Sequence, residues 1–351
     1  MFRMSPPAAL VSLVIAAAAP AVRAADPPAA APVEVRVGTN FLISDAALFI
    51  AQHKGYFKEQ GIELKLTTIE AGPKMVAPLG AGQLEVAAGA TSAGLFNAIA
   101  RGIDIKIVAD KGSAIPGASY MPIIVRKDLV ASGKVKSGKD LKGLKVAEAG
   151  QGGSPASTLN ETLVKAGLKY GDVTHVPNMA YPQHLAALSS GAIDASVTTE
   201  PTLTKALEEG VAVRLPGGDA YPNQQISVLL FGGDFIKKQP AVARRFMVAY
   251  IKGARDYNDA IKDGHLGGPN ADEVVAILAA NTHVKDAAVI RKVTASGCNP
   301  NGRVNRASLK KDLAFFKAAG FIEGDVTVDQ AVDDSFVDAA VKTLGPYKPR
   351  R

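Results

Sequence analysis

The spacing of apolar and polar residues predicts alternating strands and helices over the first two thirds of the chain. A strand with a two-residue repeat begins at Val33, and a helical repeat of apolar positions follows from Asp45 to Glu59. The alternation continues as a first series of predicted elements: strand 62–66, helix 73–80, strand 85–88, helix 91–101 and strand 105–109. Strands separated by helices are typical of parallel sheets with helices on both faces, so the pattern favours an α/β fold.

A second series of the same kind follows an apolar strand at 120–125. Its predicted elements are strand 145–147, helix 156–166, strand 174–177, helix 182–190, strand 194–198 and helix 201–209. Both series contain the motif L-x-x-G-x-[LI]-[DE]-[VA], once at 79–86 and once at 188–195. In each copy the motif predicts a helix that ends at glycine, then a strand, then a threonine-bearing turn. The repeat indicates two similarly built lobes, and these turns would lie at the carboxyl ends of strands, where open α/β sheets bind ligands.

The last third of the chain has a helical pattern after one more apolar strand at 226–231. Helices are predicted at 240–262, 272–280, 287–296, 305–319 and 331–342. We interpret this segment as a return to the first lobe, which these helices wrap. The crossings near 121–126 and 222–231 would then form a hinge. An independent helical third domain is the alternative interpretation.

A glycine-rich turn at 149–158 joins a predicted strand to a predicted helix. Its three glycines let the backbone approach a bound group closely, and Ser154 is expected to cap the helix with Pro155 at the first helical position. Free backbone amides and the helix dipole would favour an anion there. The turn contains neither a dinucleotide fingerprint nor a Walker motif. A capped helix after a flexible turn is the simpler interpretation.

The first 24 residues predict a secretory signal peptide. Arg3 supplies a positive start, Leu10 to Ala19 forms an apolar core, and small residues precede a cleavage site after Ala24. Residues 25–32 are rich in proline and alanine, which predicts a disordered lead-in. No cysteine stands at the cleavage site to carry a lipid anchor. We therefore expect an exported, soluble protein in the periplasm of a Gram-negative type of cell.

Charge and cysteine content exclude several classes of protein. The formal charge is +7, or +5 without the two arginines of the first 24 residues, and acidic and basic residues are interspersed, so no nucleic-acid partner is expected. Cys298 is the only cysteine, which excludes an intrachain disulfide. Metal ligands and cofactors are not expected, because no ligand-spaced cluster is formed by the histidines His53, His175, His184, His265 and His283.

The segment 48–64 resembles the opening of ABC-transporter substrate-binding proteins of the nitrate, sulfonate and taurine class. It contains A-x-x-x-G-Y-F-x-x-x-G-[IL]-x-[VL], and the doubled motif and the approach to the glycine-rich turn are also similar to that family. The resemblance implies an α/β, two-lobed periplasmic binding protein fold (type II). Each lobe would be a mostly parallel sheet flanked by helices, with a ligand cleft between the lobes. Lobe 1 would comprise 33–121 and 226–345, and lobe 2 would comprise 122–225.

The resemblance also implies a ligand site at the strand ends of both lobes. Its expected residues are Thr39, Asn40, Phe41, Ala90, Thr91, Ser92, Tyr120, Gly152, Gly153, Ser154, Tyr181, Thr199 and Glu200. Several have simpler interpretations: Thr91 and Ser92 as helix caps, Phe41 as a core residue, and the two tyrosines as surface or wall residues. Glu200 departs from the family pattern, in which aromatic or small residues are common near this position. An acid that faces the cleft would repel a sulfonate and could instead accept hydrogen bonds from an amine or a ring N–H.

The function implied by the resemblance is that of a non-catalytic receptor. It would hold a small organic anion, a sulfonate or a carboxylate, by turn amides and hydroxyls, and deliver it as a monomer to a membrane permease. One alternative is an enzyme of the pyrimidine-synthesis or desulfinase type, for which Cys298 is the candidate nucleophile. The other is a periplasmic sensor that uses the same closure of the lobes.

Overall fold

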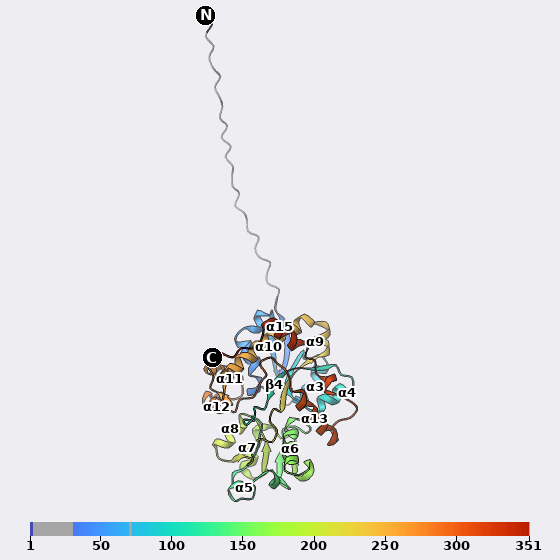
Figure 1. The fold of residues 1–351 in the computed structure, drawn as a ribbon, viewed down its shortest axis with the longest axis vertical. Coiled ribbons are helices and arrows are strands. Elements are labelled where there is room, and N and C mark those ends of the chain that lie inside the picture. The colour runs from blue at the N-terminus through green and yellow to red at the C-terminus, as the bar shows by residue number, and fades with distance from the viewer. Residues whose placement is uncertain (3–30, 70–71, 351) are drawn as a thin grey trace. The chain divides into compact units, whose positions relative to one another are not determined.

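The computed structural model describes residues 1–2, 31–69 and 72–350 of the chain (Figure 1). Its contacts separate the chain into two compact units, Met1–Ala31 and Pro32–Arg351, and every described helix and strand belongs to the second. The predicted signal peptide and the lead-in at 25–32 lie almost entirely outside the described residues. Within the described residues, no helix combines the length and the apolar character that a membrane crossing requires.

The first of two five-stranded sheets has the strand order β2-β1-β3-β10-β4. Its strands are β1 (Val33–Thr39), β2 (Ile62–Thr68), β3 (Val86–Ala90), β4 (Ile105–Ser113) and β10 (Gln225–Gly232). β1 pairs in parallel with β2 and β3, whereas β10 is antiparallel to both β3 and β4. All eight residues of β10 are buried, as expected for a mostly apolar strand in the middle of a covered sheet.

The second sheet has the order β7-β6-β8-β5-β9 and repeats the plan of the first. Its strands are β5 (Ile123–Arg126), β6 (Lys145–Ala147), β7 (Thr174–Val176), β8 (Ala195–Val197) and β9 (Ala212–Arg214). β5 is the one antiparallel strand, between β8 and β9. Each sheet contains one crossing strand, β10 in the first sheet and β5 in the second. When the other four strands of a sheet are numbered along the chain, both sheets have the order second, first, third, crossing strand, fourth. This confirms the prediction of a two-lobed α/β fold with mostly parallel sheets.

Helices follow the strands of both lobes. The first lobe has α1 (Ala46–His53), α2 (Tyr56–Glu59), α3 (Gly72–Gly80) and α4 (Ala93–Ala100), and the second has α5 (Lys127–Ala131), α6 (Ser154–Lys165), α7 (Tyr181–Ser190) and α8 (Thr202–Glu208). The single helix predicted from Asp45 to Glu59 is wrong. Gly55 has φ 74° and ends the helical path there, a conformation that glycine adopts without strain.

The last third of the chain supplies seven helices in the described residues and a short hairpin. They are α9 (Gly233–Lys238), α10 (Pro240–Ala260), α11 (Ala271–Asn281), α12 (Ala287–Lys292), α13 (Arg306–Ala318), α14 (Val328–Ala331) and α15 (Ser335–Leu344), with β11 (Ile261–Lys262) pairing β12 (His265–Leu266). Phe246 and Tyr250 of α10 belong to the same apolar core as Val35 and Val37 of β1. The long helix α10 therefore covers the first sheet.

Candidate functional site

The carboxyl end of β3 meets the glycine-rich turn of the second lobe. The amide of Ser154 donates to the carbonyl of Thr91 at 3.1 Å, and the amide of Ala93 donates to the carbonyl of Gly152 at 2.7 Å. Ser92 and Gly153 form an antiparallel bridge between these two hydrogen bonds. The structure thus brings two of the predicted strand-end segments, one from each lobe, into direct backbone contact.

This contact corrects the prediction of free amides in the turn. The amide of Ser154 is used by Thr91, and the amide of Gly153 donates to the carbonyl of Gly150 at 3.3 Å. Gly152 has φ 63°, so its glycine is required by the backbone conformation of the turn. An anion would have to replace protein acceptors at these amides.

Ser154 does not cap the helix as predicted. Helix α6 begins at Ser154 itself and its N-cap is Gly153, so Pro155 is the second helical residue, whereas the prediction placed it first. The Ser154 hydroxyl instead donates to the carbonyl of Ile226 in the crossing strand β10 at 2.9 Å. This side chain therefore holds the glycine-rich turn against the strand that connects the two lobes.

The other residues after β3 make local contacts. Ser92 caps α4, because its Oγ accepts from the amide of Leu95 at 3.3 Å, which confirms the helix-cap interpretation of this residue. The Thr91 hydroxyl lies 3.5 Å from the carbonyl of Gln225. Ala90 pairs with Ser227 of β10. The contacts of Ala90 and Thr91 place these two residues beside the start of β10.

The residues after β1 form a compact turn. The buried Thr39 Oγ1 accepts from the amide of Phe41 at 3.3 Å, and the Asn40 side-chain amide donates to the carbonyl of Ile69 at 2.8 Å. Phe41 has φ 54°, and its ring centroid lies 5.7 Å from that of Phe49. Phe41 is thus half-buried and packs against the core of the first lobe, which agrees with its interpretation as a core residue.

The two predicted tyrosines contact neighbouring parts of the chain. The Tyr120 hydroxyl lies 3.5 Å from Ser227 Oγ, and the Tyr181 hydroxyl lies 3.8 Å from the sulfur of Met121. Burial raises the pKa of both phenols. Tyr120 is buried, so the interpretation of this residue as a surface residue is wrong.

Glu200 follows Thr199 at the end of β8 and is 1% exposed. Its Oε2 accepts from the amide of Thr204 at 3.0 Å, and its Oε1 accepts from the amide of Thr294 at 2.8 Å. Burial raises the pKa of this carboxyl, and the two backbone donors oppose that rise. Both carboxyl oxygens are therefore engaged by backbone amides, one from each lobe.

A buried ion pair lies next to the predicted site and was missed by sequence reasoning. Lys111 Nζ lies 2.9 Å from Asp45 Oδ1 and 3.1 Å from Ser44 Oγ, and the two charged side chains are 1% and 0% exposed. Added to Gly112, a Cβ would lie 2.6 Å from the Tyr120 hydroxyl and 3.3 Å from Ser44 Cβ. The ion pair thus lies beside Tyr120, near the end of β4. The strand predicted from the sequence ended at residue 109 and did not include Lys111.

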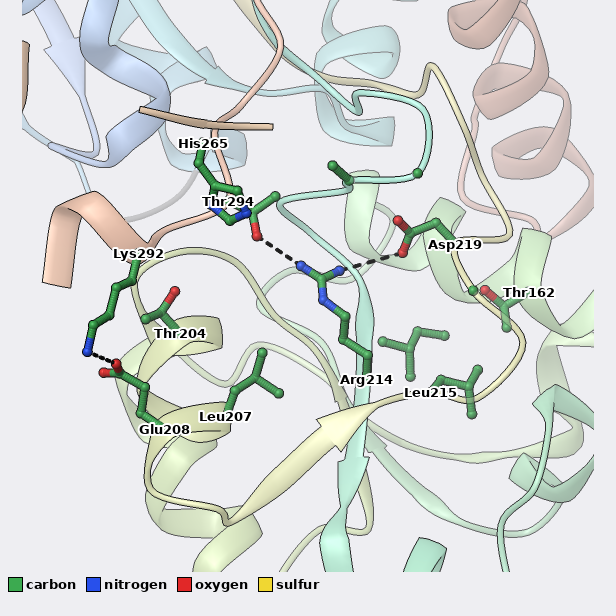
Figure 2. A pocket seen from close by; sticks show the side chains of 14 residues that line it. Thr162, Thr204, Leu207, Glu208, Arg214, Leu215, Asp219, His265, Lys292 and Thr294 are labelled. Carbon is green, nitrogen blue, oxygen red and sulfur yellow. Dashed lines mark hydrogen bonds and ion pairs between the residues drawn. The ribbon is translucent and has the colours of Figure 1, made fainter. Parts of the chain in front are cut away.

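The structure also contains a cavity of about 500 Å³ that none of the predicted site residues lines (Figure 2). It is lined by Gly117, Ala118, Ile123, Thr162, Thr204, Leu207, Glu208, Arg214, Leu215, Gly218, Asp219, His265, Lys292 and Thr294. Thr204 and Thr294 are the two residues whose amides bind Glu200. The cavity therefore begins directly beyond the Glu200 carboxyl.

Cys298 is not placed as a nucleophile would be. Its sulfur is buried 3.8 Å from the carbonyl of Asp110 and 4.0 Å from the Tyr250 hydroxyl. Burial raises the pKa of this thiol well above its usual value, which disfavours the reactive thiolate. Across residues 31–69 and 72–350, no group of three histidine, cysteine or acidic side chains is arranged to hold a metal ion.

These features define a class of protein, the two-lobed α/β proteins with the periplasmic binding protein fold. The chain belongs to the NMT1-like family, whose model matches residues 28–267. Among curated proteins it is similar to 4-amino-5-hydroxymethyl-2-methylpyrimidine phosphate synthases of Saccharomyces cerevisiae, with 28% identity over 225 residues. That match covers 60% of this chain and 62% of the length of the yeast relatives.

Solved structures of the same fold include two binding proteins. The alkanesulfonate-binding protein SsuA from Xanthomonas axonopodis pv. citri bound to MOPS matches with TM-score 0.69 and 19% identity, over 88% of this chain and 100% of that one. The periplasmic nitrate-binding protein NrtA from Synechocystis PCC 6803 matches with TM-score 0.72 and 15% identity, over 91% and 92% of the two chains. At these identities the likeness establishes the shared fold.

Proposed function

We propose that this protein is the solute-binding component of an ABC importer. It captures a small organic anion, a sulfonate or a carboxylate, between its lobes in the periplasm and delivers it to a membrane permease. The proposal rests on the backbone hydrogen bond between the Ser154 amide and the Thr91 carbonyl, because these residues belong to strand-end segments of two different lobes. Membership of the NMT1-like family and the shared fold with alkanesulfonate- and nitrate-binding proteins support it.

The anion would bind where the two lobes now share hydrogen bonds. When the lobes part, the Thr91 carbonyl withdraws and leaves the Ser154 amide at the first turn of α6, a helix of 12 residues. The positive end of the helix dipole favours an anion at this amide. A backbone amide is a neutral donor, and neutral donors suit a receptor that must also release its ligand.

The test is a binding titration of the mature protein with sulfonates, aliphatic and aromatic carboxylates and nitrate, repeated with Gly153→Asp. A Cβ at Gly153 meets its nearest neighbours at 3.4 Å, so the variant can fold. It places a carboxylate at the proposed anion position and should weaken binding about tenfold or more. Gly171→Asp is the matched control, because it adds the same charge to the second lobe at a position with open space. Equal affinities of the two variants would contradict the proposed site.

An enzyme of the pyrimidine-synthesis type is the second candidate function, favoured by the sequence similarity to the yeast synthases. The Cys298→Ala variant separates the two for any thiol-dependent reaction. If a product forms with the native protein and not with the variant, the buried thiol acts in catalysis and the receptor proposal fails. Unchanged anion binding with no turnover in either protein is the result that we expect.

A further inference from the structure

The cavity shown in Figure 2 lies between the two lobes and beside both chain crossings. Gly117 and Ala118 come from the segment between β4 and β5, and Leu215 and Asp219 come from the segment between β9 and β10. Helix α8 of the second lobe forms one side, and His265, Lys292 and Thr294 of the late segment form another. None of the residues in the predicted strand-end site lines it.

Arg214 is the central cation of the cavity. Its guanidinium lies between Thr294 and Asp219 (Figure 2), with Nη2 donating to Thr294 Oγ1 at 2.9 Å and Nη1 donating to the carbonyl of Ser119 at 3.0 Å. Among the described residues its Nε–H has no hydrogen-bond partner, and 35% of the side chain is exposed. The cation is therefore fixed in place and still has a free donor.

Asp219 places a carboxylate beside this cation. Its Oδ2 accepts from the amide of Ser119 at 2.8 Å, while its Oδ1 lies 3.7 Å from Nη1 of Arg214, beyond hydrogen-bond distance. The backbone of Ser119 thus fixes both charged groups, one through its carbonyl and one through its amide. The two side chains therefore form an ion pair without a direct hydrogen bond, and Asp219 Oδ1 accepts no hydrogen bond from another described residue.

The remaining wall is partly apolar. Leu207 of α8, Leu215 after β9 and Ile123 of β5 all line the cavity. An ion pair between Lys292 and Glu208 joins the late segment to α8 and neutralises the other two charged residues of the lining. A ligand therefore meets an ion pair whose Arg214 Nε–H and Asp219 Oδ1 have no hydrogen-bond partner among the described residues, with an apolar surface next to it.

We propose that this cavity binds an α-amino acid with an apolar side chain. An α-amino acid carries a carboxylate and an ammonium on one carbon, so it can place the first on Arg214 and the second on Asp219, with its side chain against Leu207 and Leu215. A simple carboxylate would meet the repulsion of Asp219, and a simple amine would meet that of Arg214. This site is separate from the proposed anion site, because the two share no residue.

The experiment is isothermal titration of the mature protein with L-leucine, with 4-methylpentanoate, which lacks the ammonium, and with 3-methylbutylamine, which lacks the carboxylate. L-leucine should bind at least tenfold more tightly than either analogue. Asp219→Asn should weaken L-leucine binding and remove its advantage over 4-methylpentanoate. Arg214→Gln should weaken it about tenfold or more, whereas Arg303→Gln, at an exposed arginine, should leave it unchanged.

A second variant keeps the test decisive if Arg214→Gln unfolds, since that substitution also breaks the bonds to Ser119 and Thr294. Leu207→Trp changes a residue that is 36% exposed, fills the cavity and leaves those bonds intact. It should abolish L-leucine binding with an unchanged melting temperature and unchanged anion binding.

Absence of L-leucine binding to the native protein overturns this inference and leaves the proposed anion receptor unaffected. L-leucine binding that is lost in Gly153→Asp and kept in Leu207→Trp also overturns it, because the amino acid would then occupy the strand-end site.

Discussion

Tyr221 donates its hydroxyl hydrogen to Asp312 Oδ1 at 2.7 Å, which ties the segment between β9 and β10 to helix α13. Asp312 is 1% exposed, and burial raises the pKa of its carboxyl to about 7. Ser157 and Glu161 of α6 and Lys311 of α13 also face this carboxyl, and Lys311 pairs with Glu161 at 2.6 Å. A group that titrates near neutral pH therefore stands where α13 packs on the second lobe.

The first prediction follows from the sign of this shift. The folded protein keeps the Asp312 proton to a higher pH than the unfolded chain, whose value is 3.8. Stability should therefore fall as the pH rises from about 4 to about 7 and stay constant above that range. Asp312→Asn removes the ionisation, so relative to the native protein it should gain up to about 4 kcal/mol between pH 4 and pH 8.

Urea unfolding of both proteins at several pH values measures this gain. Asp110 titrates in the same window, since burial raises its pKa to about 6, but its effect cancels in the difference between the two proteins. A difference that does not change with pH would show that folding does not shift the pKa of Asp312.

The second prediction concerns the contact between α10 and α1. A Cβ at Gly253 would overlap the carbonyl oxygen of Ala47, so Gly253→Ala should separate the two helices and lower the free energy of unfolding by about 1–3 kcal/mol or more. Thermal unfolding measures the loss. Gly171→Ala is the control, because its Cβ would meet open space, and it should change the melting temperature little.

The third prediction tests the buried ion pair. Lys111→Met leaves the Asp45 carboxylate without its cation and should cost about 3–5 kcal/mol of unfolding free energy. Asp45→Asn keeps an oxygen for the Leu42 amide, which Asp45 Oδ2 binds at 2.9 Å, so the double variant should recover much of that loss. A double variant as unstable as the sum of the two single variants would show that the two charges do not interact.

The fourth prediction addresses Glu200. Glu200→Gln replaces one acceptor oxygen with an NH2 group that faces a backbone amide of Thr204 or Thr294, and it should cost about 1–3 kcal/mol of stability. Because the side chain is buried, affinity for a sulfonate should stay within about a factor of three. A large gain in sulfonate affinity would show instead that Glu200 faces the ligand.

Sequence reasoning worked best where the chain repeats itself. The motif at 79–86 and 188–195 predicted two similar lobes, and both sheets have the same strand order. It missed the strand β9, and it failed where a glycine interrupts an apolar repeat, as at Gly55. A period of 3.6 residues continues across such a glycine, so composition alone does not show the break.

The site was harder to predict because its partners are remote in sequence. Ser154 follows a capping pattern, yet its hydroxyl donates to the carbonyl of Ile226, and the sequence around Ser154 does not indicate this distant partner. Lys111 follows a predicted strand, and the sequence around it does not indicate that Asp45 lies beside it and forms an ion pair with it. Arg214 and Asp219 are close in the chain, but the residue that fixes both, Ser119, belongs to the other crossing.

The placement of β10 has a consequence for the order in which the protein is assembled. In the first sheet β4 pairs with β10 alone among the described strands, and β10 begins only at Gln225. Until that residue is available, β4 has no strand to join, whereas all strands of the second sheet lie between Ile123 and Arg214. The second lobe can therefore complete its sheet first, and the first lobe must wait for a contact of long sequence separation, which is the slow kind of step in folding.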